Sequence, residues 1–443
     1  MAEPMSTAAR LIALMNHLGI EKAHLATQVP ADVGEFARMA AERIGGLVLC
    51  VPTRLDTAPF VALASRLLLL AGDKGLTVDI VGRAVERLPG ARRATLADYE
   101  AAGWSDVVKD RTDDVVRSMT GFLGGIDGMQ PAVAGRPRPA GAAGEHAGLT
   151  WQIDGDGPPL LLLPFFLAPS QWDPAVARLA EQFTVIRVGG PNIGGIAALE
   201  DRARAPTYRA MFHTLVDLLA LGPQARILDV GCGSGVLDRM LAQHAGPDTR
   251  IDALDLNPFF LREASKLAQA EGLGDRIAFH EMSATALPFE DASFDAVFSV
   301  TVLEECDADQ AIAEMVRVAK PGARIGIVVR AIDVGQWWNL DLTPAMHARA
   351  SVPPQSVGRG GVADRSLYRR MRGAGLVDLQ PFPAMITLDR AGGPIWRYRE
   401  DAVLPLLDAQ ETEIWRRAVA TASADGVLMQ CNVLHAAVAT KPA

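Results

Sequence analysis

Short apolar segments alternate with helical patterns over most of the chain, and one stretch without apolar periodicity interrupts them. In the first hundred residues the segments AHLATQ, GLVLCVP, LTVDIVG and ARRATL are predicted strands, and helical patterns lie between them. Such alternation is typical of a parallel sheet with crossover helices. The interruption, Gly121–Gly148, is dense in Gly, Ala and Pro, which predicts a flexible linker or an exposed loop.

A second series of predicted elements follows this interruption. LTWQID, LLLLPFF and FTVIRVGG are predicted strands, with a helix from about Pro174 to Gln182 and a glycine-rich bend, GGPNIGG, after them. Apolar residues recur with helical spacing from Thr207 to Leu221, and Gly222-Pro223 ends that helix. A new βαβ series begins at Arg226. Because the chain has 443 residues, we expect at least two α/β domains.

Charge and cysteine content narrow the function classes. A formal net charge of -9 and a pI near 5.5 argue against nucleic acid as a partner. The four cysteines stand far apart without a CxxC pair, which argues against a metal site and favours a reducing, cytoplasmic compartment. The longest apolar runs, Leu67–Ala71 and Leu160–Pro169, are shorter than the roughly 20 residues of a membrane span, and the N-terminus lacks the features of a signal peptide.

The segment ILDVGCGSG, Ile227–Gly235, carries the strongest candidate chemistry. An apolar strand runs directly into a glycine-rich turn, and a helical pattern follows. Because Gly231, Gly233 and Gly235 lack Cβ atoms, backbone N–H groups and the helix N-terminus can approach a ligand closely. The next strand ends at Asp255, where a carboxylate can accept hydrogen bonds from both hydroxyls of a ribose. The spacing is GxGxG, with Val236 where a dinucleotide fingerprint has its third glycine, which argues against a dehydrogenase.

This segment and two others together resemble class I SAM-dependent methyltransferases, of the small-molecule type similar to the enzymes of ubiquinone and menaquinone biosynthesis. ALPFEDASFDAVFSVTVLEE, Ala286–Glu305, is similar to the family's LPF-D-SFD segment before the fourth strand, and MVRVAKPGARIGIV is similar to its helix, turn and fifth strand. The resemblance covers Tyr208 to about Val329. It implies a doubly wound, Rossmann-like α/β sheet, S-adenosylmethionine (SAM) as cofactor, and a small-molecule acceptor methylated at oxygen, nitrogen or carbon.

The resemblance also implies a set of cofactor-binding residues. Ser283 stands where the family usually has an acid that contacts the adenine amino group, so a hydrogen bond there lacks charge assistance. Glu305 stands where relatives often carry a histidine after the fourth strand, which puts any role of that histidine in doubt. The implied cofactor-binding residues are Asp229, Gly231, Cys232, Gly233, Gly235, Asp255, Leu256, Ser283, Ala284 and Thr301.

We expect the acceptor at the carboxyl ends of the fourth and fifth strands, where open α/β sheets bind ligands. Glu304, Arg330, Trp337 and Trp338 are predicted to line its pocket; tryptophan offers a broad apolar wall, although one of the two is expected in the core. His347, predicted in a polar loop, and Glu305 are the candidate catalytic residues for an acceptor that must lose a proton.

The N-terminal part resembles α/β-hydrolases without their catalytic residues. Val29, in ATQVPADVG, occupies the place of the nucleophile, and no histidine occurs between His24 and His146. Residues 148–205 resemble the first strands of the same fold, so the order of the two parts is reversed. Either they pack as one permuted, catalytically dead domain, or they are two separate α/β fragments that cover or dimerise the methyltransferase.

The predicted organisation therefore has four parts: a hydrolase-like segment 1–125, a linker 126–147, a second hydrolase-like segment 148–205 and a methyltransferase domain 206–443. The predicted function is SAM-dependent methyl transfer to a small molecule. The alternative is a non-catalytic SAM-binding sensor or scaffold, because an intact cofactor site does not by itself establish chemistry. We expect no metal, no nucleic-acid partner and no membrane span, and a homodimer is possible.

Overall fold

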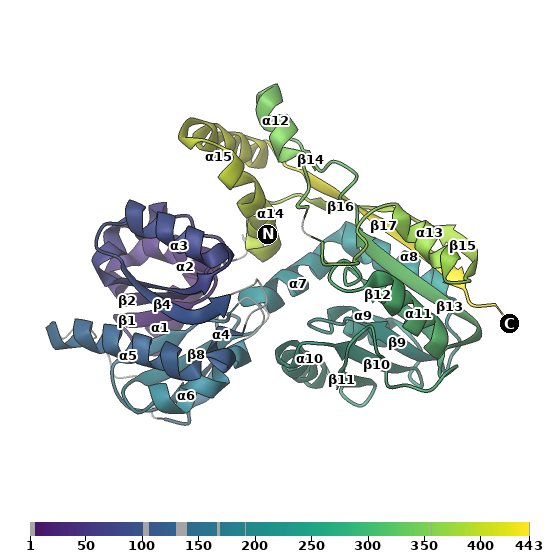
Figure 1. The fold of residues 1–443 in the computed structure, drawn as a ribbon, viewed down its shortest axis with the longest axis horizontal. Helices are drawn as coiled ribbons and strands as arrows, with labels where there is room; N and C mark the ends of the chain where they lie inside the picture. Colours follow the sequence, from purple (N-terminus) through teal and green to yellow (C-terminus); the bar gives the residue numbers. More distant parts are fainter. Residues whose placement is uncertain are drawn as a thin grey trace. The chain divides into compact units, whose positions relative to one another are not determined.

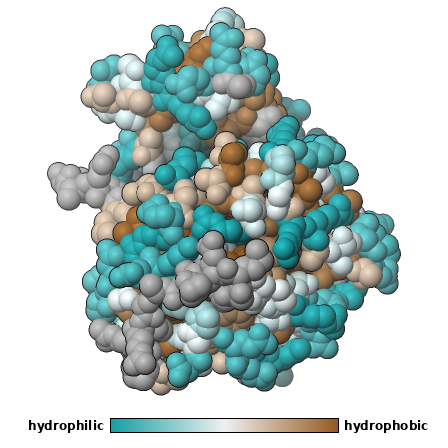
Figure 2. Space-filling model, turned by 90° about the vertical axis from the view of Figure 1, so that its left-hand side faces the viewer, coloured by the Kyte–Doolittle hydropathy of each residue, from teal (hydrophilic) through white to brown (hydrophobic). Residues whose placement is uncertain are grey.

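The computed structural model describes residues 5–100, 106–129, 140–165, 169–190, 192–355 and 357–442. The chain divides into two compact units, Met1–Ala198 and Leu199–Ala443, which Figure 1 shows in purple to teal and in teal to yellow. The division falls inside helix α7 (Gly194–Arg204). In the described part of the chain, no helix is long and apolar enough to cross a membrane. The face drawn in Figure 2 mixes hydrophilic residues with scattered hydrophobic ones, as is ordinary for a protein surface.

The first unit is built on one eight-stranded sheet in the order β4-β3-β2-β1-β7-β8-β6-β5. The strands from β4 to β8 in this order run parallel, and β6 and β5 add antiparallel pairs at one edge. The strands are β1 (Ala23–Thr27), β2 (Ile44–Cys50), β3 (Leu67–Lys74), β4 (Arg92–Glu100), β5 (Ala143–His146), β6 (Leu149–Asp154), β7 (Pro159–Leu162) and β8 (Thr184–Gly189).

Helices cover both faces of this sheet, because alternate residues of its buried strands point to opposite sides. On one face Leu47 and Leu49 pack with α1, α2 and α3. On the other face Val48 and Cys50 pack with α5 and α6. The helices of this unit are α1 (Thr7–His17), α2 (Pro30–Ala40), α3 (Leu76–Arg87), α4 (Val107–Asp110), α5 (Thr112–Met129) and α6 (Asp173–Leu179), with short 3-10 turns at 41–43, 58–66 and 169–172.

Two expectations about this unit are wrong. The segment Leu76–Gly82 is not a strand but the start of α3, whose buried positions Thr77, Val81, Ala84 and Leu88 follow helical spacing. The strand at this place in the sheet is β3. The predicted linker is also partly structured, since α5 continues to Met129 and β5 pairs with β6; residues 130–139 lie outside the described residues.

The second unit contains a nine-stranded sheet with the path β11-β10-β9-β12-β13-β17-β14, and β15 and β16 also pair with β17. The first five strands of this path are parallel, whereas β17 runs antiparallel to β13. The strands are β9 (Arg226–Val230), β10 (Arg250–Asp255), β11 (Ile277–Glu281), β12 (Phe294–Val300), β13 (Ala319–Arg330), β14 (Trp337–Trp338), β15 (Val377–Pro381), β16 (Ala384–Leu388) and β17 (Gln430–Thr440).

Both faces of the parallel strands are covered, which confirms the predicted doubly wound, Rossmann-like fold. Ile227 and Phe298 pack with α8, α9 and α10 on one face, and Leu228 and Val297 pack with α11 and α13 on the other. The helices are α8 (Pro206–Leu219), α9 (Val236–His244), α10 (Pro258–Ala270), α11 (Ala308–Val318), α12 (Pro344–Ala350), α13 (Ser366–Gly373), α14 (Gly393–Val403) and α15 (Ala409–Ala424), with a 3-10 turn at 404–406.

Besides the cores on the two faces of this sheet, the second unit has a third hydrophobic core, next to β14 at the end of the sheet. It joins β14, α12, α14 and α15, which Figure 1 shows as a group above the parallel strands. Its centre is a set of three tryptophans: the Trp338 ring meets those of Trp396 and Trp415 edge to face, with centroids 5.4 and 4.9 Å away. This group extends the sheet past the point where the predicted methyltransferase resemblance ends.

Candidate functional site

The glycine loop between β9 and α9 has a backbone that only glycine adopts readily. Gly231 has φ +89°, and a Cβ there would lie 2.2 Å from Cγ2 of Val302, so a side chain is excluded both by conformation and by space. The N–H groups of Gly231 and Cys232 both donate to the carbonyl of Leu254 at 2.8 Å. The loop is therefore tied to β10, the strand that carries the predicted ribose acid.

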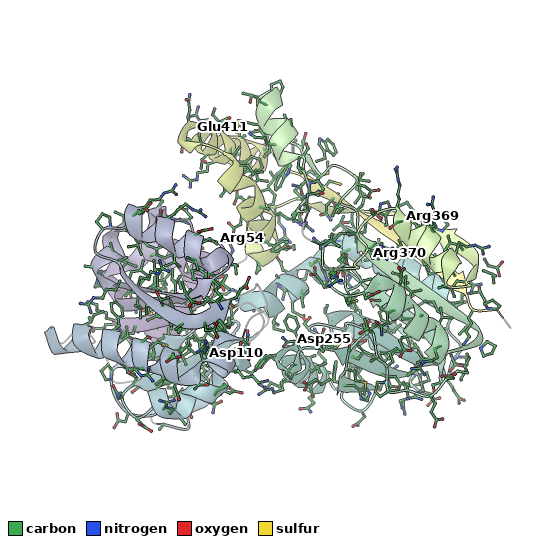
Figure 3. All side chains as sticks on the ribbon, viewed as in Figure 1. Arg54, Asp110, Asp255, Arg369, Arg370 and Glu411 are labelled. Carbon is green, nitrogen blue, oxygen red and sulfur yellow. The ribbon has the colours of Figure 1, made fainter. Side chains whose placement is uncertain are left out.

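Asp255 joins the glycine loop to the start of α10. Its Oδ2 accepts the N–H of Gly233 and its Oδ1 accepts the N–H of Asn257, both at 2.9 Å. Burial raises the pKa of this carboxyl, and the two backbone bonds counteract that rise. Each carboxylate oxygen has a second lone pair, so the group can still accept hydrogen bonds from two hydroxyls. Figure 3 shows Asp255 beside this helix, and the next residue, Leu256, is 71% exposed.

The segment that carries Ser283 lies beside Asp255. Strands β10 and β11 pair so that Asp255 is opposite Glu281, and the N–H of Met282 donates to the carbonyl of Asp255 at 3.1 Å. The Ser283 hydroxyl lies 2.8 Å from that of Thr285, and the neighbouring Ala284 is half-buried. The structure thus brings the ribose acid and the predicted adenine contact to one edge of the sheet.

A second acid lies beside Asp229 at the base of the loop. Asp229 and Asp238 are both buried and lie close enough for their carboxyl groups to influence each other. Burial raises the pKa of both carboxyls, and the charge of Asp238 raises the pKa of Asp229 further. Asp238 was missed in the sequence, although it lies on the apolar face of α9 between Leu237 and Leu241, where a charged residue is unusual.

Glu304 is the most strongly buried acid at the carboxyl end of β12. Its Oε1 accepts the N–H of Arg330 at 2.6 Å and lies 3.6 Å from Nε of the same residue. Its Oε2 has no hydrogen-bond partner among the described residues. Burial raises the pKa of Glu304 to about 7. By contrast, the Glu305 side chain is 48% exposed, and its Oε1 lies 3.3 Å from Nη2 of Arg330.

Tyr208 and Arg202 also belong to this edge, and neither was found in the sequence. The Arg202 guanidinium lies over the Tyr208 ring, 4.8 Å from its centroid, and Nη1 donates to Oγ1 of Thr301 at 3.2 Å. Thr301 itself has φ +58° directly after β12. Burial raises the pKa of Tyr208, and the charges of Arg202, Asp229 and Glu304 all act on it. An aromatic residue on the buried face of a helix gives no signal beyond packing.

The structure separates the two predicted tryptophans, one of which was expected in the core, and it places His347 differently from the expectation. Trp338 is 1% exposed, and its indole N–H donates to the carbonyl of Ala350 at 3.0 Å, so it belongs to the core and not to a pocket wall. Trp337 points the other way from β14 and is 51% exposed. His347 lies in α12 rather than in a polar loop, and α12 packs on β14 and the tryptophan core. No contact described in the structure brings His347 to Glu304.

A glycine turn after the first strand of a parallel sheet, with an acid at the end of the next strand, defines the class of nucleoside-binding α/β domains. Residues 227–322 match the family described as a methyltransferase domain. The predicted methyltransferase resemblance of the second unit is therefore confirmed over these residues. The same match supports SAM as the cofactor of this class.

Curated relatives match the same part of the chain. A ubiquinone/menaquinone biosynthesis C-methyltransferase of Hahella chejuensis is 33% identical over 155 residues, which are 32% of this chain and 62% of that protein. The corresponding protein of Brucella anthropi is 39% identical over 129 residues, 28% of this chain and 49% of that protein. A sterol 24-C-methyltransferase of Gibberella zeae is 31% identical over 116 residues, 26% of this chain and 30% of that protein. The chain thus spans less than two thirds of each of these relatives.

Proposed function

We propose that this protein transfers a methyl group from SAM to a small-molecule acceptor. The observation that carries the proposal is the Asp255 carboxylate, which holds the glycine loop through Gly233 and keeps lone pairs for a ribose diol. The family match over residues 227–322 supports the same activity. A sensor that binds SAM without chemistry would need the cofactor site alone, and the buried Glu304 after β12 and Arg330 at the end of β13 favour an enzyme.

The residues present fit SAM. The glycine loop leaves room for backbone approach, Asp255 offers two acceptors to the ribose, and the exposed Leu256 offers an apolar surface to the adenine. Ser283 can accept a hydrogen bond from the adenine amino group. The Asp229–Asp238 pair, which retains one negative charge when it shares one proton, suits the ammonium group of the methionine part.

When bound, SAM would supply a methyl group on a sulfonium, whose carbon an acceptor atom would attack in line, with S-adenosylhomocysteine as the leaving group. The chain needs no nucleophile of its own, and its main tasks are to align the acceptor and exclude water. Glu304 is suited to accept a proton from an acceptor hydroxyl or amine, since a base with a pKa near neutrality is the most effective at physiological pH. Its Oε2 is the atom that would take this proton.

All three relatives named above are C-methyltransferases by name, two of ubiquinone/menaquinone biosynthesis and one of a sterol. These names support an extended organic acceptor for this chain. The accepting atom determines whether Glu304 is needed as a base. A phenol or hydroxyl must lose a proton as it is methylated, whereas an activated carbon loses its proton after the methyl group has been transferred.

For the first unit we propose a permuted, catalytically inactive hydrolase-like domain. Support comes from the single sheet that its two segments form, in which β1 pairs with β7. Strand β1 also turns directly into α2 at Val29, as in a nucleophile elbow, but Val29 has an ordinary extended backbone with φ -102° and carries no nucleophile.

Calorimetric titration of SAM into the full chain tests the proposed function. Asp255→Ala should weaken binding by roughly ten- to a hundredfold, because it removes charge-assisted hydrogen bonds worth about 1.5 to 3 kcal/mol. Asp275→Ala makes the same change at an exposed acid of the same unit and should leave the affinity unchanged. Equal affinity in both variants and the wild type would show that the ribose binds elsewhere, and no binding by the wild type would refute the proposal.

A further inference from the structure

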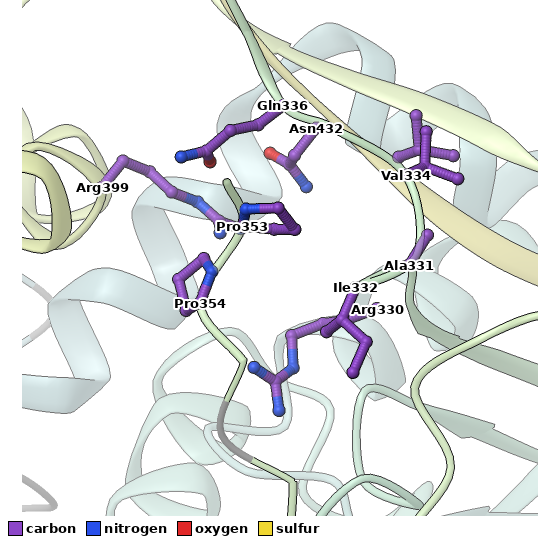
Figure 4. Close-up of a pocket in the computed structure, with 10 residues that line it drawn as sticks. Arg330, Ala331, Ile332, Val334, Gln336, Pro353, Pro354, Arg399 and Asn432 are labelled. Carbon is purple, nitrogen blue, oxygen red and sulfur yellow. The ribbon is translucent and has the colours of Figure 1, made fainter. Parts of the chain in front are cut away.

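A small cavity lies at the carboxyl end of β13, inside the second unit. Its lining includes Arg330 from the end of β13, Arg399 from α14, and the amide side chains of Gln336 and Asn432. Figure 4 shows the two arginines approaching it from different elements. The cavity volume is about 20 Å³, which is space for one or two water molecules. It therefore suits the compact polar head of a ligand and not a whole acceptor.

The polar lining of this cavity consists mainly of donors. Guanidinium groups donate and never accept hydrogen bonds, and the amide of Asn432 adds donor N–H groups. The amide nitrogen of Gln336 already donates to the carbonyls of Ala350 and Val352 at 2.8 and 3.3 Å, so the donors left for a ligand are those of the two arginines and of Asn432. Such a lining matches a group with several acceptor oxygens, since two guanidinium groups can bind one oxyanion through parallel hydrogen bonds.

Positive charge accumulates around the cavity. Arg202 and Arg330 both repel the Arg399 guanidinium, and together with burial, the larger cause, they lower its pKa to about 10. Arg399 stays charged at neutral pH, and no carboxylate among the described residues lies within ion-pair distance of it. Its one described contact is the ring of Tyr398, 5.6 Å from the guanidinium carbon to the centroid.

The nearby acids do not neutralise this charge. Glu304 and Glu305 both face Arg330, and the pKa of Glu304 is raised to about 7, so at neutral pH about half of its charge is absent. Of the three arginines that act on one another here, only Arg330 is shown to face these two glutamates, and one of the two is only partly ionised. Like charges held together away from water are unfavourable, and a bound anion removes this penalty.

We propose that this cavity binds an oxyanion group of the methyl acceptor, a carboxylate or a phosphate, with Arg399 and Arg330 as the two sides of the clamp. This inference rests on the proposed function, because the cavity adjoins Glu304 at the edge where the acceptor is expected. It assigns a role to Arg399, which forms no ion pair with any residue that the structure describes. It also defines the substrate class: a small organic anion and not a neutral compound.

The test uses the full chain, saturated with S-adenosylhomocysteine, and three probes titrated by calorimetry: inorganic phosphate, pyrophosphate and benzoate. The wild type should bind at least one of them, and the strongest probe identifies the source as a phosphate or a carboxylate. Arg399→Gln should weaken that binding tenfold or more, because hydrogen bonds to a charged group are lost. Arg399→Lys keeps the charge but lacks the planar guanidinium, so its affinity for the probe should lie between those of the wild type and Arg399→Gln.

Arg390→Gln is the matched control, since Arg390 is an exposed arginine of the same unit whose nearest acid is Asp389, 3.8 Å away. It should bind the probes like the wild type. SAM affinity is measured for every variant and should agree within about twofold, because distinct sites are perturbed separately.

Several results would overturn the inference. These are failure of the wild type to bind any probe while SAM still binds, equal binding by Arg399→Gln and the wild type, and equal losses in Arg399→Gln and Arg390→Gln. A loss of SAM affinity in Arg399→Gln would assign the cavity to the carboxylate of the cofactor instead. Failure of the wild type to bind SAM would refute the proposed function itself, so the two ideas fail separately.

Discussion

Glu304→Gln should remove a pH dependence from the stability of the second unit. The substitution keeps the size and shape of the side chain and makes it permanently neutral. The Glu304 carboxyl is buried, and its pKa stands at about 7 against an ordinary value of 4.5. Between these two pH values the unfolded chain releases this proton while the folded chain retains it. The folded state therefore loses stability as the pH rises through this window.

The magnitude follows from the difference in pKa. A change of one in pKa corresponds to about 1.4 kcal/mol, so the folded wild type loses about 3 kcal/mol of unfolding free energy between pH 5 and 8 from this group. In a unit of this size each kcal/mol shifts the melting temperature by roughly 2 to 4 °C. The variant should then gain roughly 6 to 12 °C over the wild type on going from pH 5 to pH 8.

Scanning calorimetry of the full chain at a series of pH values measures this difference. The transition that belongs to the second unit is identified by its upward shift when SAM is added. Glu305→Gln makes the same chemical change at a half-exposed neighbour and is the control. A constant offset between Glu304→Gln and the wild type would reflect the new amide group alone. If the two curves stay parallel from pH 5 to 8, the buried-acid argument for Glu304 is refuted.

Two further predictions concern the tryptophans and the first unit. Trp338→Ala should destabilise the second unit by roughly 3 to 5 kcal/mol, as expected for truncating a buried aromatic side chain. Trp337→Ala should leave the melting temperature nearly unchanged and affect acceptor turnover alone. Equal melting temperatures of the two variants would contradict the burial of Trp338. A fluorophosphonate probe should not label residues 1–198, because Val29 stands where a nucleophile would be, and stoichiometric labelling on a serine of this unit would overturn the proposal of an inactive hydrolase-like domain.

The methyltransferase sheet was predictable because its signals are local. The glycine loop, Asp255 and the start of β12 follow one another along short stretches of sequence, and each has a backbone reason for its residue types. The prediction of a strand at Leu76–Gly82 was wrong because its local signal is ambiguous. The apolar residues at first alternate as in a strand, and only the buried positions Val81, Ala84 and Leu88 reveal the helix.

The acceptor side of the site was only partly predictable. Glu304 and Arg330 were found because they end strands, where ligands bind in open α/β sheets. Arg202 lies on α7, before β9, and Arg399 lies on α14, long after β13. Nothing in either helical pattern shows that the charges of these two arginines will act on each other. Charge accumulation of this kind becomes visible only when the elements are assembled.

The order of strands in the first unit also has a consequence for synthesis on the ribosome. Strand β1 pairs with β7, and the hydroxyl of Thr27 donates to the carbonyl of Pro164, a residue 137 positions later in the sequence. The early strands therefore cannot close their sheet until the later segment has left the exit tunnel, and their apolar edges must remain unpaired for that time. Such long-range pairing slows folding and exposes chains to aggregation. We expect nascent chains of this protein to depend on chaperones that shield strand edges during translation.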